Sequence, residues 1–278
     1  NPLSKIAAVA EVILVRFVVV NFLILGINRL FPGFEAWQTQ TLGFAFPVFG
    51  DVIMAACALG AILVRRKNLA AYGITFKHPA YHLDITAACF IPVVLAGMPL
   101  AALDFKSWGG ALILSAVQIG LLFALALILR KKPSVPVAGI AAGLVFLFPA
   151  VQTAAPTAGK ILALFLTYAL FVGFGEEIIY RGYMQSRLDE AFGKPYRFFG
   201  VPFGWGALLS AALFGFSHSG VTGFLLNLST EITLAWGLWT TFGGLVFSLV
   251  REKTGSILAP ALLHGLPQAV AVTVMLFF

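Results

Sequence analysis

The chain has 278 residues, of which 60% are hydrophobic and only 10% are charged, and its mean hydropathy is +0.97. Soluble globular domains carry roughly 25% charged residues, so this composition excludes a water-soluble fold. Within a bilayer only helices and closed barrels satisfy the backbone, and the long unbroken apolar runs do not resemble the short alternating strands of a barrel. We therefore expect an all-α fold, a polytopic transmembrane helical bundle.

A membrane span needs about 20 mainly apolar residues. The sequence predicts eight to nine spans, and the fifth candidate is short and contains two prolines. In chain order the candidates are 6–28, 42–64, 83–103, 110–129, 136–152, 160–180, 201–218, 232–250 and 256–278. Glu11, Arg16 and Asn21 in the first span are expected to satisfy interhelical bonds, and Asp51 is expected near a span end, where hydration is cheap.

The net charge of +7 is distributed unevenly along the chain. Lys and Arg recur before the first span and after every even one, whereas only Arg29, Lys106 and Lys160 fall on the other side. The positive-inside rule then places the N-terminus in the cytoplasm, and we expect a multi-pass protein of a cell membrane, a prokaryotic plasma membrane. The charge follows the topology, so no nucleic-acid partner is expected.

The end of the sixth predicted span carries an acidic pair, in residues 175–182 with the sequence Gly-Glu-Glu-Ile-Ile-Tyr-Arg-Gly. Ionisable groups within a span usually face a bundle interior or a water-filled cavity. Glu177 and Arg181 are i and i+4, so they share a helical face and can form an ion pair, which would be a purely structural contact. Glu176 lies about 100° further round the helix and needs another partner.

Two histidines lie within the later predicted spans. His218 follows Phe214 by four residues, and His264 and Gln268 are i and i+4, so an imidazole and a carboxamide share one face. Each could simply bond to a neighbouring helix. At 1.5 Å per residue, Glu176 and His218 each lie about 24 Å from the cytoplasmic end of their helix. His264 lies only about 12 Å in and matches less well unless its helix tilts.

A carboxylate and an imidazole that converge on one water can remove its proton and make it a nucleophile for a carbonyl. A second histidine and an amide could donate to the developing oxyanion. Alternatively, Glu176, His218 and His264 could ligate zinc, with water as the fourth ligand. The HExxH motif is absent, and no carboxylate obviously orients either histidine, so we expect no cofactor.

Together these residues resemble the three ordered motifs of the CPBP family: Glu176-Glu177-x-x-x-Arg181, Phe214-x-x-x-His218 and His264-x-x-x-Gln268. That family contains the type II CaaX prenyl proteases (the Ras-converting enzymes) and the bacteriocin-processing or self-immunity (Abi) membrane proteins. The flanks agree, with Arg-Gly-Tyr-Met-Gln at 181–185 and Thr-Gly-Ser-Ile-Leu-Ala-Pro at 254–260. The resemblance covers residues 160–275.

The resemblance implies a glutamate-dependent intramembrane endopeptidase that cuts near the C-terminus of its substrate. By this resemblance, Glu176 would be the general base and His218 would help to activate water. His264 and Gln268 would stabilise the oxyanion. The supporting residues would be Glu177, Arg181 and Phe214. The family pattern usually ends in Asn, and Gln268 places its amide about 1.5 Å further out, whereas catalysis is sensitive to shifts of about 1 Å.

We expect one transmembrane domain over 1–278, with spans without motifs in 1–155 and the catalytic core in 156–278. The expected partners are membrane lipids and a peptide or protein with a C-terminal tail, either lipid-modified or membrane-spanning. Two other functions are compatible with the same residues. One is a non-catalytic immunity or scaffold relative, which the Gln268 departure favours. The other is a proton-coupled transporter. Transporters often repeat their motifs in both halves, and the N-terminal half of this chain has no counterpart to the Glu-Glu and His motifs, which counts against this function.

Overall fold

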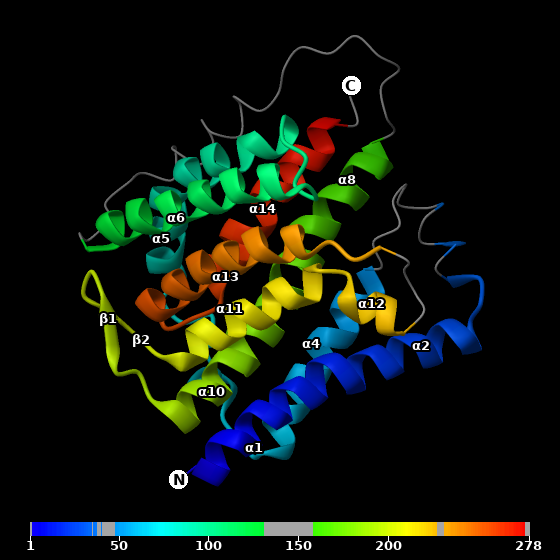
Figure 1. The fold of residues 1–278 in the computed structure, drawn as a ribbon, viewed down its shortest axis with the longest axis horizontal. Coiled ribbons are helices and arrows are strands. Elements are labelled where there is room, and N and C mark those ends of the chain that lie inside the picture. Colours follow the sequence, from blue (N-terminus) through cyan, green and yellow to red (C-terminus); the bar gives the residue numbers. More distant parts are fainter. Residues whose placement is uncertain are drawn as a thin grey trace.

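The computed structural model describes residues 2–34, 36–37, 40, 48–130, 158–226 and 231–275, and this part of the chain is almost entirely helical (Figure 1). Within the described residues, four helices are long and apolar enough to cross a membrane: Pro2–Leu30, Pro79–Ala101, Trp108–Arg130 and Ile161–Phe192. Val48–Val64 and Leu258–Thr273 are shorter apolar helices. The all-α membrane fold is therefore confirmed, whereas the count of eight to nine spans is not. The predicted span 136–152 lies outside the described residues.

The described residues of the first half of the chain form four long helical rods. The first consists of α1 (Pro2–Ile13), the π-helical segment η1 (Leu14–Val19) and α2 (Val20–Leu30). The second is α4 (Val48–Val64), followed by the short 3-10 turn η2 (Leu69–Tyr72). α5 (Pro79–Gly97), which continues into η3 (Met98–Ala101), packs against α6 (Trp108–Arg130).

The second half begins with a continuous helix that changes its winding four times. Its parts are α8 (Ala158–Leu166), π-helical η4 (Thr167–Val172), α9 (Gly173–Glu177), π-helical η5 (Ile178–Met184) and α10 (Gln185–Phe192). The helix ends at Phe192, because Gly193 takes φ 74°, a conformation that glycine adopts without strain. π-helical turns are rare and occur mostly at functional sites, and here two of them flank the acidic pair.

The predicted span 201–218 is wrong at its start. Residues Tyr196–Phe198 (β1) and Val201–Phe203 (β2) form an antiparallel hairpin, and α11 begins only at Trp205 and ends at His218. Phe199 and Gly200 connect the strands with φ 49° and 87°, and a two-residue turn with both φ positive matches the twist of a hairpin. The apolar character of 201–203 therefore serves a strand.

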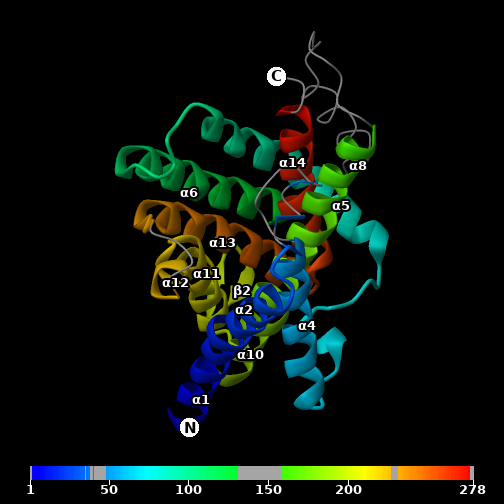
Figure 2. The same cartoon turned by 90° about the vertical axis from the view of Figure 1, so that its right-hand side faces the viewer.

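The last three helices complete the bundle. α12 (Val221–Leu225) is short, α13 spans Leu234–Thr254 and α14 spans Leu258–Met275. α13 packs between α11 and α6, and α14 contacts α5, η4 and α9. Figures 1 and 2 both place α1 and α10 at one end of the bundle and the last turns of α14 at the other. In this bundle α9 and α14 are direct neighbours.

One end of the bundle gathers the loops that follow the even predicted spans. Arg65 contacts Glu11 at 2.9 Å and Glu190 at 3.3 Å, and the Ser256 hydroxyl donates to Thr75 O at 2.9 Å. In the loops that follow odd predicted spans, Lys106 pairs with Glu231 at 2.7 Å. Loops predicted to share a side of the membrane thus lie together in these contacts, which supports the predicted alternation of sides.

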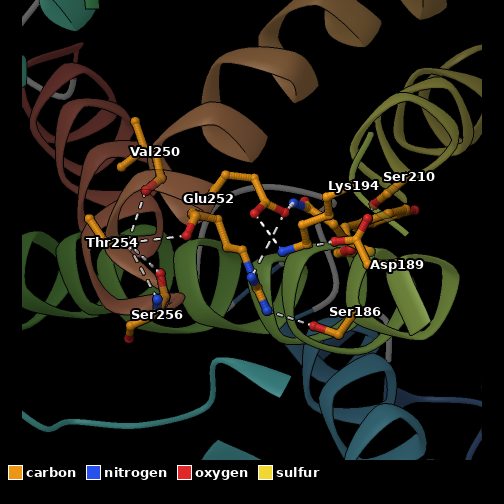
Figure 3. A network of polar contacts seen from close by, with 11 residues as sticks. Ser186, Asp189, Lys194, Ser210, Val250, Glu252, Thr254 and Ser256 are labelled. Atoms are coloured by element: carbon orange, nitrogen blue, oxygen red, sulfur yellow. Dashed lines mark hydrogen bonds and ion pairs between the residues drawn. The ribbon is translucent and has the colours of Figure 1, made fainter. Parts of the chain in front are cut away.

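A buried polar network ties α10 to the end of α13 (Figure 3). Glu252, whose side chain is 2% exposed, accepts from Gln185 Nε2 and from Lys194 Nζ, both at 2.6 Å. Lys194 also reaches Asp189 at 3.3 Å, and Arg251 Nη2 donates to the Ser186 hydroxyl at 2.7 Å. These contacts hold the end of the helix that carries the acidic pair.

Candidate active site

Two glycines bring the acidic pair close to the last helix. A Cβ on Gly173 would lie 2.7 Å from Ala261 O, and a Cβ on Gly265 would lie 2.7 Å from the carbonyl oxygens of Tyr168 and Ala169. Neither position can hold a side chain without movement of the backbone. Small residues allow helices in membranes to approach closely, and this approach places Glu176 and Glu177 opposite His264.

Glu177 lies at the centre of a buried polar cluster. Its Oε1 is 3.0 Å from Arg181 Nη1 and 3.0 Å from His264 Nδ1. The side chains of Glu177 and Arg181 are both 0% exposed. The predicted i,i+4 pair is therefore confirmed. Arg181 also donates from Nη2 to Gly244 O at 3.0 Å, which anchors the pair to α13.

His264 lies between the two glutamates. Its Nδ1 faces Glu177, and its Nε2 is 3.6 Å from Glu176 Oε2, which is longer than a hydrogen bond. When Nδ1–H donates to Glu177, Nε2 is directed at the Glu176 carboxylate. A carboxylate that orients a histidine from behind is a recurring device of hydrolytic sites.

Aromatic rings surround this cluster. The Phe247 ring stacks on the His264 imidazole with centroids 4.6 Å apart and an interplanar angle of 18°. The Arg181 guanidinium lies 4.5 Å from the Phe214 ring centroid, and Tyr180 meets Phe214 edge-on at 5.0 Å. These rings exclude water around the Glu177–Arg181 pair and restrict the rotation of both charged side chains.

His218 is the last residue of α11 and belongs to the same neighbourhood through Phe214. The Phe214 ring is 4.5 Å from the His218 ring and 5.9 Å from the His264 ring. Nδ1 of His218 is 2.9 Å from Phe214 O, and Trp236 contacts the imidazole edge-on at 5.6 Å. Because Nδ1 is occupied by this contact, Nε2 is the ring nitrogen left for a substrate or water, and the His218 side chain is only half-buried.

The residues predicted from the sequence do not all meet. Glu176, Glu177, Arg181 and His264 form direct contacts, and Phe214 links them to His218. Gln268 lies one turn beyond His264 with an exposed side chain. The depth estimate set His264 apart from Glu176, and the expectation that no carboxylate orients either histidine is wrong, because Glu177 orients His264.

The described residues show no group of three or more His, Cys, Asp or Glu side chains that could hold a metal ion. His264 presents Nδ1 and Nε2 to two different carboxylates, whereas zinc ligands would direct single donor atoms at one point. The residues therefore do not fit a zinc site in this arrangement, and no step below uses a metal.

A helical membrane protein with two buried glutamates and two histidines in one neighbourhood has the parts of a water-activating hydrolase. Residues 158–270 match the family model of the type II CAAX prenyl endopeptidases, described as Rce1-like. The match covers less than half of the chain, and it confirms the resemblance seen in the three motifs. No curated protein and no solved structure matches the chain.

Proposed function

We propose that the protein is an intramembrane endopeptidase that hydrolyses a peptide bond near the C-terminus of a membrane-associated substrate, with Glu176 as the general base. The observation that carries this proposal is the placement of Glu176 Oε2 3.6 Å from His264 Nε2, in a cluster that Glu177 fixes from behind. The family match over 158–270 supports the reaction class.

In the proposed reaction Glu176 removes a proton from water while the water oxygen bonds to the scissile carbonyl carbon. The carbonyl oxygen becomes an oxyanion, which the Gln268 amide stabilises together with His264 when its Nε2 carries a proton, a contribution of a few kcal/mol for one such donor. His218 helps to orient the water. When the tetrahedral intermediate collapses, the C–N bond breaks and Glu176 returns its proton to the leaving amine.

Burial supports these roles. Glu176 is 6% exposed and His264 is 5% exposed, so their interactions with a charge that develops between them are strengthened by the low dielectric. Glu176 Oε2 has no hydrogen-bond partner among the described residues, which leaves this oxygen free to accept a proton from water. His218 is half-buried and Gln268 is exposed, so their side chains remain accessible from outside the buried cluster.

The substrate is proposed by the same family relation. CAAX-type endopeptidases act on C-terminal tails, so we propose a peptide or protein with such a tail, held at the membrane by a lipid or a span. The protein would act in a cell membrane, a prokaryotic plasma membrane, with its N-terminus in the cytoplasm, as the distribution of Lys and Arg indicates.

The test is a cleavage assay on the purified protein in detergent. A panel of C-terminal tail peptides, with and without a prenyl group, is followed by mass spectrometry for the wild type, Glu176→Ala and His218→Ala, with and without a zinc chelator. Glu231→Ala, which removes a carboxylate outside the cluster, is the matched control. We expect cleavage that both site substitutions abolish and that the control and the chelator leave intact.

Two outcomes would contradict the proposal. Loss of activity on chelation alone would require zinc chemistry in place of a glutamate base. A folded wild type that cuts no peptide of the panel would favour a non-catalytic relative that binds tails, for which the exposed Gln268 at the position of the family's Asn is the favouring observation.

A further inference from the structure

Asp51 is a buried acid that the proposed chemistry does not use. It lies in the first turn of α4, is 1% exposed, and neither of its carboxyl oxygens has a hydrogen-bond partner among the described residues. The expectation that it would be hydrated near a span end is wrong. A buried carboxyl without partners is costly, and ionisable groups kept inside a membrane protein usually serve its function.

The position of Asp51 connects it with Glu176. α4 packs against α9, and a Cβ on Gly175 would lie 2.8 Å from Asp51 Cβ and 3.1 Å from Asp51 O. Asp51 therefore lies against the residue that directly precedes Glu176, and only glycine leaves it room. The Asp51 carboxyl interacts electrostatically with Glu176, which has a partnerless oxygen of its own.

Arg16 supplies a positive charge at the same place. It lies in η1, which contacts α4, and its Nε donates to the Tyr180 hydroxyl at 2.7 Å. Its charge interacts with Asp51. The charged groups that act electrostatically on Asp51 are Arg16 from η1 and Glu176 from α9, and Asp51 in turn acts on Tyr168 from η4. Arg16 and Asp51 both lie outside the segment 158–270 that matches the family.

We propose that Asp51 is a positioning residue for Glu176, with Arg16 as the counter-charge that permits two carboxyls in one buried place. The Asp51 carboxyl and the Arg16 guanidinium together set the electrostatic surroundings of the Glu176 carboxylate, so removal of the Asp51 carboxyl alters the proton transfer at Glu176. The N-terminal helices then tune the base that the C-terminal motifs provide. This inference rests on the proposed function in its catalytic part only.

The test has a kinetic arm and a stability arm. In the kinetic arm, Asp51→Asn is expected to lower kcat between about tenfold and a hundredfold with KM unchanged, and Asp51→Glu is expected to restore part of kcat. Asp189→Asn is the matched control, since Asp189 is another acid with a buried side chain (7% exposed) that lies in the network of Figure 3, away from Glu176.

The stability arm compares melting temperatures of the wild type, Asp51→Asn, Glu176→Gln and the double variant in one detergent. If the two carboxyls act on each other, the shift of the double variant differs from the sum of the single shifts. Asp51→Ser takes the place of Asp51→Asn in both arms if the latter does not fold. This arm needs no substrate, so it reads the Asp51–Glu176 coupling even for an inactive wild type.

Each combination of results in the two arms supports or overturns the inference. A fall in kcat together with non-additive melting supports the inference. A wild type without peptidase activity but with non-additive melting overturns the proposed function and retains the pairing of Asp51 with Glu176. Additive melting shifts overturn the inference, whatever happens to kcat, and so does an Asp51→Asn enzyme with the kcat of the wild type.

Discussion

Glu177 and His264 are 87 positions apart in the sequence, and their side chains lie 3.0 Å apart in the interior of the bundle. The contact joins the first family motif to the last, and Arg181 completes it from the other side of the same Glu177 oxygen. Because both partners of Glu177 are cations or potential cations, its negative charge is the element that holds the cluster together.

Glu177→Gln removes that charge and leaves Arg181 buried without its partner. Breaking a buried ion pair costs about 3–5 kcal/mol, so thermal unfolding in detergent is expected at a clearly lower temperature. Peptidase activity below that temperature is expected to fall by a factor on the order of 10², because His264 loses its orientation. An enzyme that keeps full activity with this substitution would show that Glu177 does not orient His264.

Gly265→Ala tests the close approach of α14 to η4 and α9. The added methyl group would meet the carbonyl oxygens of Tyr168 and Ala169, and such overpacking costs about 1–3 kcal/mol. The control is Gly120→Ala in α6, where a Cβ has nothing within 4 Å and alanine favours the helix. We expect a lower unfolding temperature for the first variant only, measured in the same detergent, and equal values would contradict the packing.

Glu252→Gln tests the network of Figure 3. Glu252 accepts from Gln185 and Lys194 with a side chain that is 2% exposed, so loss of its charge is expected to cost about 3–5 kcal/mol of unfolding free energy. Glu231→Gln removes a carboxylate whose side chain is 59% exposed and which pairs with Lys106, a kind of pair that contributes at most about 1 kcal/mol. Denaturant unfolding of both variants checks the difference, and similar losses would refute it.

Cysteine labelling in intact cells tests the orientation. Lys67 and Glu231 have side chains that are 43% and 59% exposed, and they lie in loops predicted on opposite sides of the membrane. In a variant without Cys57 and Cys89, a membrane-impermeant thiol reagent is expected to label Glu231→Cys and to spare Lys67→Cys until the cells are opened. The reverse pattern would invert the topology.

The sequence predicts the local features of the fold and site well. Composition alone predicts a helical membrane protein, and the i,i+4 spacing predicts the Glu177–Arg181 pair, because partners one turn apart meet in any helix. Gly193 marks the end of the long helix for the same local reason. Such features depend on a few neighbouring residues and require no knowledge of the bundle.

The features that the sequence does not reveal depend on contacts between distant helices. The approach of His264 to both glutamates requires the close helix contacts at Gly173 and Gly265. An estimate of how deep each residue lies in its own helix does not include such contacts between helices. Asp51 looks like a hydrated span end until α9 covers it. The hairpin 196–203 is hidden because three apolar residues at its end continue the hydrophobic pattern of α11.

The central claim is that the Glu176 carboxylate is the base, and the most direct measurement is kcat of Glu176→Gln against wild type on a peptide that the wild type cuts. Gln has nearly the shape of Glu but cannot take a proton, so a loss on the order of 10²–10⁴-fold is expected, with an unfolding temperature close to that of the wild type. A Glu176→Gln enzyme that retains kcat would contradict the account.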